Sequence, residues 1–479
     1  MNTEKQVANN VVWKYLEMIS VSGIQMLCTF IMARFLTAAD YGILGIVLVF
    51  SAFADVFIYS GFGQALIREK VVTRTDYSTV LYFNIAISLT LYTILYFSSG
   101  LIADIYEQPI LNDICKVAYL ILPIHALSLV QMTKLQKEVK FKKIFFTSFI
   151  SSSLSAAIAI YIAYTYRSVW ALVLQVMMTS TFRCLLLWLT TDFIPVLKFS
   201  KESFNKYFKF SKNIMLSGFI ATLFNNIYSL VIGKTYSTTE LGYYSQANKI
   251  NNLASQTTTQ VVQSVTYPIL SKINNKGGDI KIGYKKIISS TLIIVGFVMA
   301  TILCCAQDFF ELCMGNAVWR TAGTYFLLMG VSGILYPLQA VNVNILYVTG
   351  NSRTNLYLEI LRRSLMAAII IVTINFNINI FILGLSIYSL AQLMLNLYFC
   401  GKPINYTIKE QLKDAYPIFI RLAIMIIVGN IITYSLSSLH LLIRILLSCS
   451  ICIATGLLLF WKQKDFITLC KLLKSYIKK

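Results

Sequence analysis

Charged and metal-binding side chains are scarce in this sequence. Asp, Glu, Lys and Arg make up 13% of its 479 residues, and only two histidines occur, His125 and His440. Soluble domains carry about 25% charged residues, so a soluble fold of this composition would expose large apolar patches. The ten cysteines include one C-x-x-C pair, Cys449 and Cys452, inside the apolar segment LLIRILLSCSICIATGLLLF. With no histidine or second cysteine pair near it in sequence, this pair is typical of buried apolar filler, and we expect no metal and no cofactor.

Acidic residues are also few, with 20 Asp and Glu against 41 Lys and Arg. A net charge of +21 is compatible with binding to nucleic acid. Such binding needs a contiguous basic face, whereas these cations lie in short blocks between apolar segments. The sequence therefore excludes nucleic acid as the expected partner and indicates membrane lipids instead.

Long apolar runs are abundant. Hydrophobic residues make up 57% of the chain and the mean hydropathy is +0.69. A transmembrane helix needs about 20 apolar residues, which predicts an all-α integral membrane protein with about fourteen spans. The first span contains Lys14 and Glu17 and lacks a signal-peptide pattern, so we expect it to be retained. The predicted spans are 11–33, 42–62, 79–98, 111–133, 144–164, 169–190, 214–234, 242–270, 287–305, 323–349, 356–375, 380–400, 416–436 and 441–461.

The connecting segments test this count. With a cytoplasmic N-terminus, the inside segments hold 29 of the 41 Lys and Arg and the outside connections hold four. This bias predicts that both termini are cytoplasmic. The basic segments 191–213 and 462–479 are expected to be amphipathic helices on the membrane surface. The longest outside segment, 306–322, has 17 residues, which leaves no room for a catalytic domain, so we expect a protein without enzymatic activity or catalytic residues.

One motif occurs twice, 200 residues apart. Residues 33–44, ARFLTAADYGIL, align with residues 233–244, GKTYSTTELGYY, through a shared order of small, basic, hydroxyl, acidic and glycine residues. A hydroxyl three residues before an acid is the spacing of a helix-capping box. Capping explains each copy but not the duplication, which is typical of transporters built from two pseudo-symmetric lobes around a central cavity. We predict a six-helix lobe at 1–200, a second at 201–401, and two additional helices with a basic tail at 402–479.

Ionisable residues occur inside the first two predicted spans. Lys14, Glu17 and Gln25 lie on one face of a helix at about 100° per residue, and Asp55 is isolated in the apolar segment FSAFADVFIYSGF. Each charged group costs at least about 2.5 kcal/mol at the middle of a bilayer. These side chains should therefore face a hydrated cavity or a partner.

The eighth predicted span is the most polar. Its polar side chains form one stripe at helical spacing: Lys249, Asn252, Gln256, Gln260 and Gln263. A helix with this face either lines a hydrated cavity or packs on equally polar helices through hydrogen bonds. Both alternatives remain open for the amides.

A further basic cluster begins the eleventh predicted span. Glu359 precedes Arg362 and Arg363 by three and four residues, the spacing of ion pairs along one helix. We expect Glu359 to pair with these arginines, which leaves one positive charge in excess for an anion.

Three segments resemble one known group of transporters. ARFLTAADYGILGIVLVFSAFADVFIYSGFGQALIREK at 33–70 resembles the N-terminal region of Wzx-type polysaccharide flippases, in the polysaccharide transporter branch of the MOP (multidrug/oligosaccharidyl-lipid/polysaccharide) exporter superfamily. GYYSQANKINNLASQ with YPILSKI, within 242–273, and LYPLQAVNVNILYVTGNSRTNLYLEILRR at 335–363 are similar to later spans of that group.

The resemblance implies a two-lobed flippase whose central cavity opens alternately to each side. The implied substrate is an oligosaccharide repeat unit linked to undecaprenyl diphosphate, with other membrane proteins of polysaccharide assembly as further partners. Cations can replace phosphate hydration, and amides can match sugar hydroxyls. The candidates are Lys14, Arg34 and Lys249 for the diphosphate, Glu17 and Asp55 for a coupling ion, and Gln25, Asn252, Gln256 and Gln260 for sugar.

Three alternatives remain. A drug or cation antiporter of the same superfamily would share the fold but should have a more apolar, aromatic and acidic cavity. A lipid II flippase differs only in its substrate. A membrane-embedded polymerase or ligase usually needs a long outside loop, which this sequence lacks.

Overall fold

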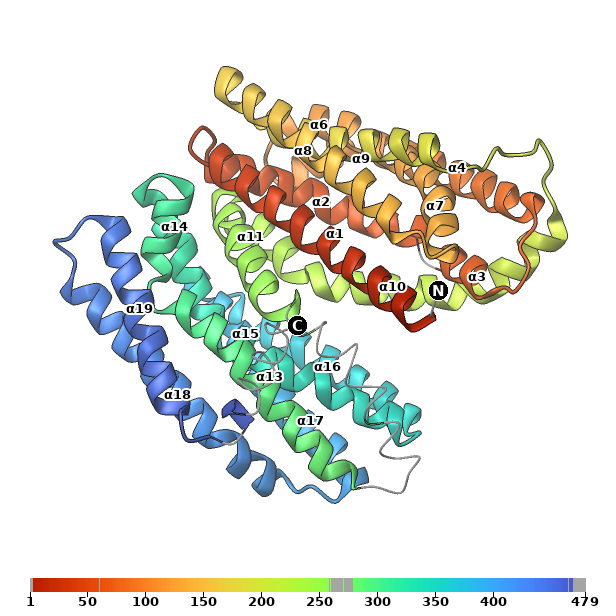
Figure 1. Cartoon of the computed structure of the whole chain (residues 1–479). Helices are drawn as coiled ribbons and strands as arrows, with labels where there is room; N and C mark the ends of the chain where they lie inside the picture. The colour runs from red at the N-terminus through yellow and green to blue at the C-terminus, as the bar shows by residue number, and fades with distance from the viewer. Residues whose placement is uncertain are drawn as a thin grey trace. The chain divides into compact units, whose positions relative to one another are not determined.

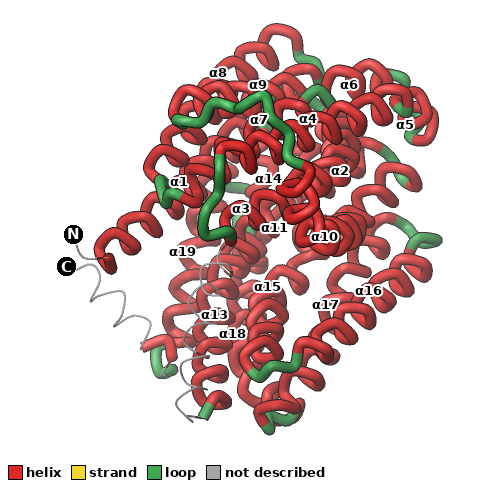
Figure 2. Tube along the Cα trace, turned by 90° about the vertical axis from the view of Figure 1, so that its right-hand side faces the viewer, coloured by secondary structure: helices red, strands yellow, loops and turns green. Residues whose placement is uncertain are grey.

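The computed structural model describes residues 3–59, 61–257, 259, 270, 279–463 and 465–467. Every regular element among these residues is a helix (Figure 2), which confirms the predicted all-α class. The chain divides into two compact units, unit 1 at 1–242 and unit 2 at 243–479, which are described separately.

Unit 1 contains ten helices in the part of the chain that the structure describes, and the first turn of an eleventh (Figure 1). They are α1 (Thr3–Met32), α2 (Ala38–Tyr59), α3 (Phe62–Arg68), α4 (Arg74–Phe97), α5 (Ser99–Ile105), α6 (Ile110–Ala118), α7 (Ile121–Lys137), α8 (Phe141–Tyr166), α9 (Trp170–Thr190), α10 (Lys201–Thr235) and α11 (Thr238–Asn252).

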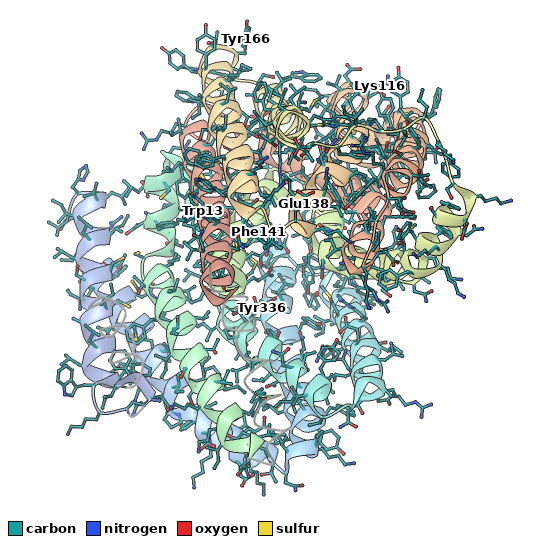
Figure 3. The ribbon with its side chains drawn as sticks, turned by 45° about the vertical axis from the view of Figure 1, so that its right-hand side comes forward. Trp13, Lys116, Glu138, Phe141, Tyr166 and Tyr336 are labelled. Atoms are coloured by element: carbon teal, nitrogen blue, oxygen red, sulfur yellow. The ribbon has the colours of Figure 1, made fainter. Side chains whose placement is uncertain are left out.

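Small side chains allow close helix packing in unit 1. The buried face of α8 includes Ser151, Ser155 and Ala159, and α8 packs on both α1 and α9. Small residues at an interface let membrane helices approach closely. At one end of this interface, Trp13 of α1 contacts the ring of Phe145, with 5.3 Å between ring centroids; Trp13 and the first residue of α8, Phe141, are labelled in Figure 3.

Two predicted segments differ from the observed helices. The span predicted at 111–133 is formed by two helices, α6 and α7, and Pro123 lies in the first turn of α7, where its missing N–H costs no helical hydrogen bond. The surface helix predicted at 191–213 is helical only from Lys201, and residues 201–213 continue without a break into the 35-residue helix α10. Ser200 caps that helix by accepting a hydrogen bond from the Ser203 backbone N–H at 3.2 Å.

Both copies of the repeated motif form helix caps, as predicted. Thr37 N–H donates to the Asp40 carboxylate at 2.8 Å, and Asp40 N–H donates back to the Thr37 hydroxyl at 3.4 Å. In the second copy, Glu240 N–H donates to the Ser237 hydroxyl at 3.1 Å. The acids lie in the first turns of α2 and α11, where a negative charge is favoured by the helix dipole.

Unit 2 holds the rest of α11 and the remaining helices. Its elements are η1 (Leu253–Thr257), α13 (Ile280–Leu303), α14 (Ala306–Met314), η2 (Ala317–Trp319), α15 (Arg320–Val348), α16 (Ser352–Thr373), α17 (Ile378–Gly401), η3 (Lys402–Ile404), α18 (Ile408–Ser435) and α19 (Leu441–Phe460). α15 packs on α13, α14 and α17, while α18 and α19 pack on each other and on α13. The last two helices therefore share a core with the helices that precede them.

Twelve described helices are long and apolar enough to cross a membrane, and each corresponds to a predicted span. The two other predicted spans are the polar ones. The span at 356–375 is a helix, α16, but it carries Glu359 and two arginines. The span at 242–270 lies partly outside the described residues, so the total of fourteen stays a prediction. The boundary predicted at 200 falls within unit 1, because α10 packs on α2.

Candidate functional site

Glu17 is the centre of a polar cluster in unit 1. Its side chain is 9% exposed, and its carboxylate lies 2.7 Å from the Lys14 ammonium and 3.7 Å from the Arg183 guanidinium. The hydroxyl of Ser148 donates to the same carboxylate at 3.0 Å. Two cations therefore compensate this buried acid, which joins α1, α8 and α9. Lys14, a candidate for the diphosphate, is already paired with Glu17 although half of its side chain is exposed.

Asp55 also has a partner, which could not be found from the sequence. Nδ1 of His125, on α7, lies 2.7 Å from the Asp55 carboxylate, and Nε2 lies 3.1 Å from the hydroxyl of Ser180, on α9. The ring of Tyr59 packs on the imidazole with 5.5 Å between centroids. A carboxylate, an imidazole and a hydroxyl thus form one chain across α2, α7 and α9.

This chain borders a pocket of about 300 Å³. The apolar part of its wall includes Ile67, Leu129 and Leu187. The polar side chains that line the pocket are Tyr59, Gln64, His125, Ser128, Thr133, Gln136, Ser180 and Arg183. Hydroxyls and amides both donate and accept hydrogen bonds, so the pocket offers both kinds of partner beside one permanent cation.

Arg183 is the strongest anion-binding group in this pocket. Its side chain is 38% exposed, and its Nε–H is a buried donor with no hydrogen-bond partner among the described residues. A guanidinium binds phosphate or carboxylate oxygens through parallel N–H groups. Sequence reasoning could not single out Arg183, because its place in α9 does not indicate which helices lie beside it.

Backbone hydrogen bonds and ion pairs hold the helix ends near this pocket. The Lys137 ammonium donates to the backbone carbonyl of Leu66 at 2.7 Å and also to that of Glu69. The Glu69 carboxylate lies 2.7 Å from the Lys206 ammonium, and this hydrogen bond keeps the pKa of Glu69 below its ordinary value. These contacts join the ends of α3 and α7 to α10.

Two other predicted residues of unit 1 lie away from the pocket. Gln25 is exposed on α1, and Arg34 is exposed in the turn after α1. From Lys14 to the end of α1 at Met32, the helix rises about 27 Å. Lys14 and Arg34 therefore lie far apart along the axis of α1 and do not form a single binding site in this structure.

The predicted polar stripe of the eighth span is described only in part. Lys249 is half-buried in the last turn of α11. The Gln256 amide donates to the Asn252 side-chain oxygen at 2.8 Å, where the helix widens into the π-helical turn η1. Gln260 lies outside the described residues.

The cluster predicted in the eleventh span is paired, as expected. The Glu359 carboxylate lies 3.2 Å from Arg362 and 2.7 Å from Arg363. Arg362 is buried and also donates two hydrogen bonds, at 3.0 and 2.6 Å, to the side-chain oxygen of Asn396 on α17. Arg362 thus joins α16 to α17, and this contact accounts for its burial.

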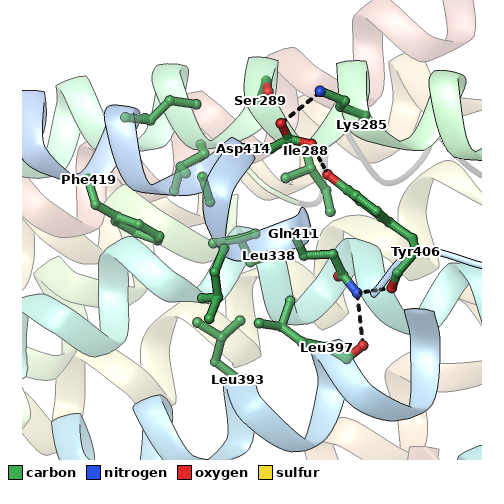
Figure 4. Close-up of a pocket in the computed structure, with 14 residues that line it drawn as sticks. Lys285, Ile288, Ser289, Leu338, Leu393, Leu397, Tyr406, Gln411, Asp414 and Phe419 are labelled. Carbon is green, nitrogen blue, oxygen red and sulfur yellow. Dashed lines mark hydrogen bonds and ion pairs between the residues drawn. The ribbon is translucent and has the colours of Figure 1, made fainter. Parts of the chain in front are cut away.

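A second pocket lies in unit 2, between α13, α15, α17 and α18 (Figure 4). Leu338, Leu393 and Phe419 line it, and its polar edge is the ion pair of Lys285 with Asp414 at 2.8 Å. The cavity volume is only about 20 Å³, which is room for about one water molecule. This space is a gap in helix packing rather than a substrate site.

The family described as "Polysaccharide biosynthesis protein" matches residues 31–322, more than half of the chain. The chain belongs to this polysaccharide biosynthesis family. The match includes all pocket residues of unit 1, and it confirms the resemblance to the polysaccharide transporters predicted from the sequence.

Three curated proteins are similar to this family member. The teichuronic acid biosynthesis protein TuaB of Bacillus subtilis is 23% identical over 74% of this chain and 73% of its own length. The succinoglycan biosynthesis transport protein ExoT of Rhizobium meliloti is 23% identical over 56% of this chain and 54% of its own. The lipopolysaccharide biosynthesis protein WzxC of Escherichia coli is 21% identical over 70% of this chain and 68% of its own length. These names agree with a transporter rather than an enzyme.

Solved structures show the same fold. The inward closed conformation of the lipid II flippase MurJ has a TM-score of 0.72 and 14% identity, over 95% of this chain and all of that chain. An inward-facing multidrug transporter of the MATE family, in the MOP superfamily, has a TM-score of 0.64 and 13% identity, over 83% of this chain and 98% of its own. The family member therefore has the fold of the MOP superfamily.

Proposed function

We propose that this protein is a flippase that moves oligosaccharide repeat units, linked to undecaprenyl diphosphate, across the bacterial cytoplasmic membrane. Family membership supports the polysaccharide pathway, and the names of the relatives support transport. The observation that carries the proposal is the unit 1 pocket, where Arg183 and a set of hydroxyls and amides lie within an apolar helix bundle.

The charge distribution supports a cytoplasmic position for this pocket. With the N-terminus inside, α2, the span formed by α6 and α7, and α9 each begin after an outside connection and run inward. Tyr59 is the last residue of α2, and Gln136 is followed by the last residue of α7. The pocket thus lies in the inner half of the helices, beside the lysine-rich segment 134–143, where a lipid-linked unit made in the cytoplasm would enter.

The pocket suits the chemistry of that substrate. A diphosphate carries about two negative charges and accepts hydrogen bonds from a guanidinium, and the buried Nε–H of Arg183 has no other acceptor among the described residues. Lys14 can add a second positive charge when its ammonium turns from Glu17. Hydroxyl and amide side chains match sugar hydroxyls. In unit 2, Lys249, Asn252 and Gln256 stay proposed substrate contacts on the sequence argument alone, independently of the unit 1 pocket.

A cationic drug is a poorer fit for this pocket. The permanent charge that lines the pocket, Arg183, is positive, and the two acids that contact its lining residues are already paired, Glu17 with Lys14 and Asp55 with His125. Lipid II and the proposed repeat unit both carry a diphosphate and differ in the glycan. A lipid II flippase is therefore distinguished by which of the two substrates it transports. Transport in proteoliposomes of a labelled repeat unit, lipid II and a cationic dye separates the three functions.

Arg183 provides the direct test of the proposed function. We expect Arg183→Gln to reduce export of the repeat unit at least tenfold, with unchanged abundance in the membrane, and Arg183→Lys to keep part of the activity because the charge remains. Lys198→Gln, a change of an exposed loop cation, is the control. Wild-type export from Arg183→Gln at wild-type abundance would show that this pocket does not bind the head group.

A further inference from the structure

Four cysteines from two distant parts of the chain meet in unit 2. Cys304 and Cys305 follow the last residue of α13, and Cys449 and Cys452 lie one turn apart on α19. The Sγ atoms of Cys305 and Cys449 are 3.5 Å apart. The three sulfur atoms of Cys304, Cys305 and Cys449 all lie within 4.8 Å of one another.

These three thiols also surround one backbone oxygen. The carbonyl oxygen of Thr301 lies 3.1 Å from Sγ of Cys304 and 3.7 Å from Sγ of both Cys305 and Cys449. Thr301 is in the last turn of α13, where carbonyl groups lack the usual helical partner. Three sulfurs and one oxygen thus converge on a small volume at the end of a helix.

The cluster is enclosed by protein. Cys304 and Cys305 are no more than 2% exposed, and Cys449 is half-buried. Gly429 of α18 leaves the space that Cys304 occupies, since a Cβ atom there would overlap with Cys304 Cβ and lie 3.2 Å from its sulfur. Cys452 borders the same space, with its Cβ 3.5 Å from that position.

The separations fit a metal ion better than a disulfide. Sulfur ligands at about 2.3 Å from a tetrahedral zinc ion lie about 3.8 Å apart, and sulfur and oxygen ligands lie about 3.6 Å apart. The observed distances, 3.5 Å between two sulfurs and 3.1–3.7 Å from sulfur to oxygen, are close to these values. A disulfide needs about 2.05 Å and would use only two of the three thiols.

We propose that Cys304, Cys305 and Cys449, with the carbonyl oxygen of Thr301, form a binding site for a thiophilic d¹⁰ ion, with Zn²⁺ as the ion bound. Thiolate ligands select zinc and similar soft ions. Each thiol that binds the ion releases its proton to solvent, so the affinity falls as the pH is lowered. The bound ion joins α19 to the end of α13 and stabilises the C-terminal helix pair against the rest of unit 2.

Metal binding is tested on the purified full-length protein in detergent, reduced and free of chelator. Cd²⁺ serves as an optical probe, because thiolate ligands give it an ultraviolet charge-transfer band, and Zn²⁺ is titrated against a chromophoric chelator. We expect one ion per chain and a higher thermal unfolding midpoint with either ion. Cys305→Ser and Cys449→Ser should weaken binding at least tenfold.

The matched controls are buried cysteines outside the cluster. Cys115→Ser and Cys400→Ser change buried thiols of unit 1 and unit 2 and should leave the stoichiometry and affinity unchanged. If the cluster variants do not fold, maleimide labelling of the wild-type protein, mapped by mass spectrometry, should show Zn²⁺ protecting the three cluster cysteines. Absence of an ion-dependent band or protection overturns the proposal. A Cys305–Cys449 disulfide that persists in the reduced protein, detected by mass spectrometry as the loss of two hydrogens, together with no zinc binding, assigns the pair to a disulfide instead.

Discussion

Gly42 and Gly242, which occupy the same position in the two copies of the repeated motif, pack reciprocally within unit 1. A Cβ atom on Gly42 would overlap with the carbonyl oxygen of Thr238, and one on Gly242 would overlap with that of Ala38. Thr238 and Ala38 are themselves equivalent positions of the repeat, at the first residues of α11 and α2. The two copies of the motif therefore pack against each other through equivalent residues.

This packing predicts that neither glycine tolerates a side chain. Gly42→Ala and Gly242→Ala should each destabilise the protein by about 3 kcal/mol or more, since the clashing atoms belong to the backbone and cannot rotate away. Valine should be worse at both positions. The measurement is the thermal unfolding midpoint of the detergent-solubilised protein.

Gly23 supplies the control for that experiment. It is also a glycine in a membrane-spanning helix, but among the described residues no neighbouring atom lies within 4 Å of the position that a Cβ atom would take there. Alanine also favours a helix over glycine. Gly23→Ala should therefore leave the midpoint unchanged or raise it. Equal midpoints for all three alanine variants would contradict the close approach at the repeat.

The topology prediction concerns both ends of the chain. Because 29 of 41 Lys and Arg fall in the proposed inside segments, a reporter fused after Val72 and one fused after Lys479 should both report a cytoplasmic location. A reporter after Val318, in the longest proposed outside segment, is the matched control and should give the opposite signal. A periplasmic C-terminus would refute the count of fourteen spans.

Sequence periodicity and hydropathy predicted most of the fold because lipid imposes a simple requirement. A spanning helix must form its backbone hydrogen bonds within itself and expose apolar side chains to lipid. Twelve apolar helices could therefore be located without tertiary information. The helix caps at Thr37 and Ser237 were also predictable, since their hydrogen bonds join residues three apart. The ion pairs of Glu359 were predictable for the same reason.

Long-range contacts could not be predicted in this way. Asp55 required a partner, yet no spacing rule connects it to His125, 70 residues away. Cys449 looked like an apolar filler because Cys305, 144 residues earlier, is not near it in the sequence. Periodicity specifies the face of a helix, but only packing decides which helix meets that face.

The ion pair between Asp308 and Arg444 is a further long-range contact with a testable cost. Asp308 is 2% exposed, and its carboxylate lies 2.6 Å from Arg444 of α19 and 2.9 Å from Arg320. Asp308→Asn leaves the Arg444 charge, 11% exposed, with only a neutral partner. We expect a loss of about 3–5 kcal/mol, measured as a lower midpoint of thermal unfolding.

Glu311 is the control for Asp308, since it pairs with the same Arg320 at 2.7 Å but is 24% exposed. Glu311→Gln should cost about 1 kcal/mol or less. Combining Asp308→Asn with Arg444→Gln should recover part of the loss, because the buried uncompensated charge is removed. A double variant as unstable as the sum of its parts would show that the two residues act independently.

The last prediction concerns the ion that drives transport, and it separates the two buried acids of unit 1. Glu17 lies between two cations, Lys14 and Arg183, and its ion pairs hold α1 to α9. Asp55 instead contacts His125, the side chain most suited to exchanging a proton near neutral pH. In proteoliposomes, a proton gradient should accelerate wild-type transport, whereas Asp55→Asn and His125→Gln should transport at a rate that no longer responds to the gradient. Glu17→Gln should keep the response even where its abundance falls, because the proton-exchanging pair is intact. A full response in Asp55→Asn, or a wild-type response to Na⁺ in place of protons, would rule out this pair as the coupling site.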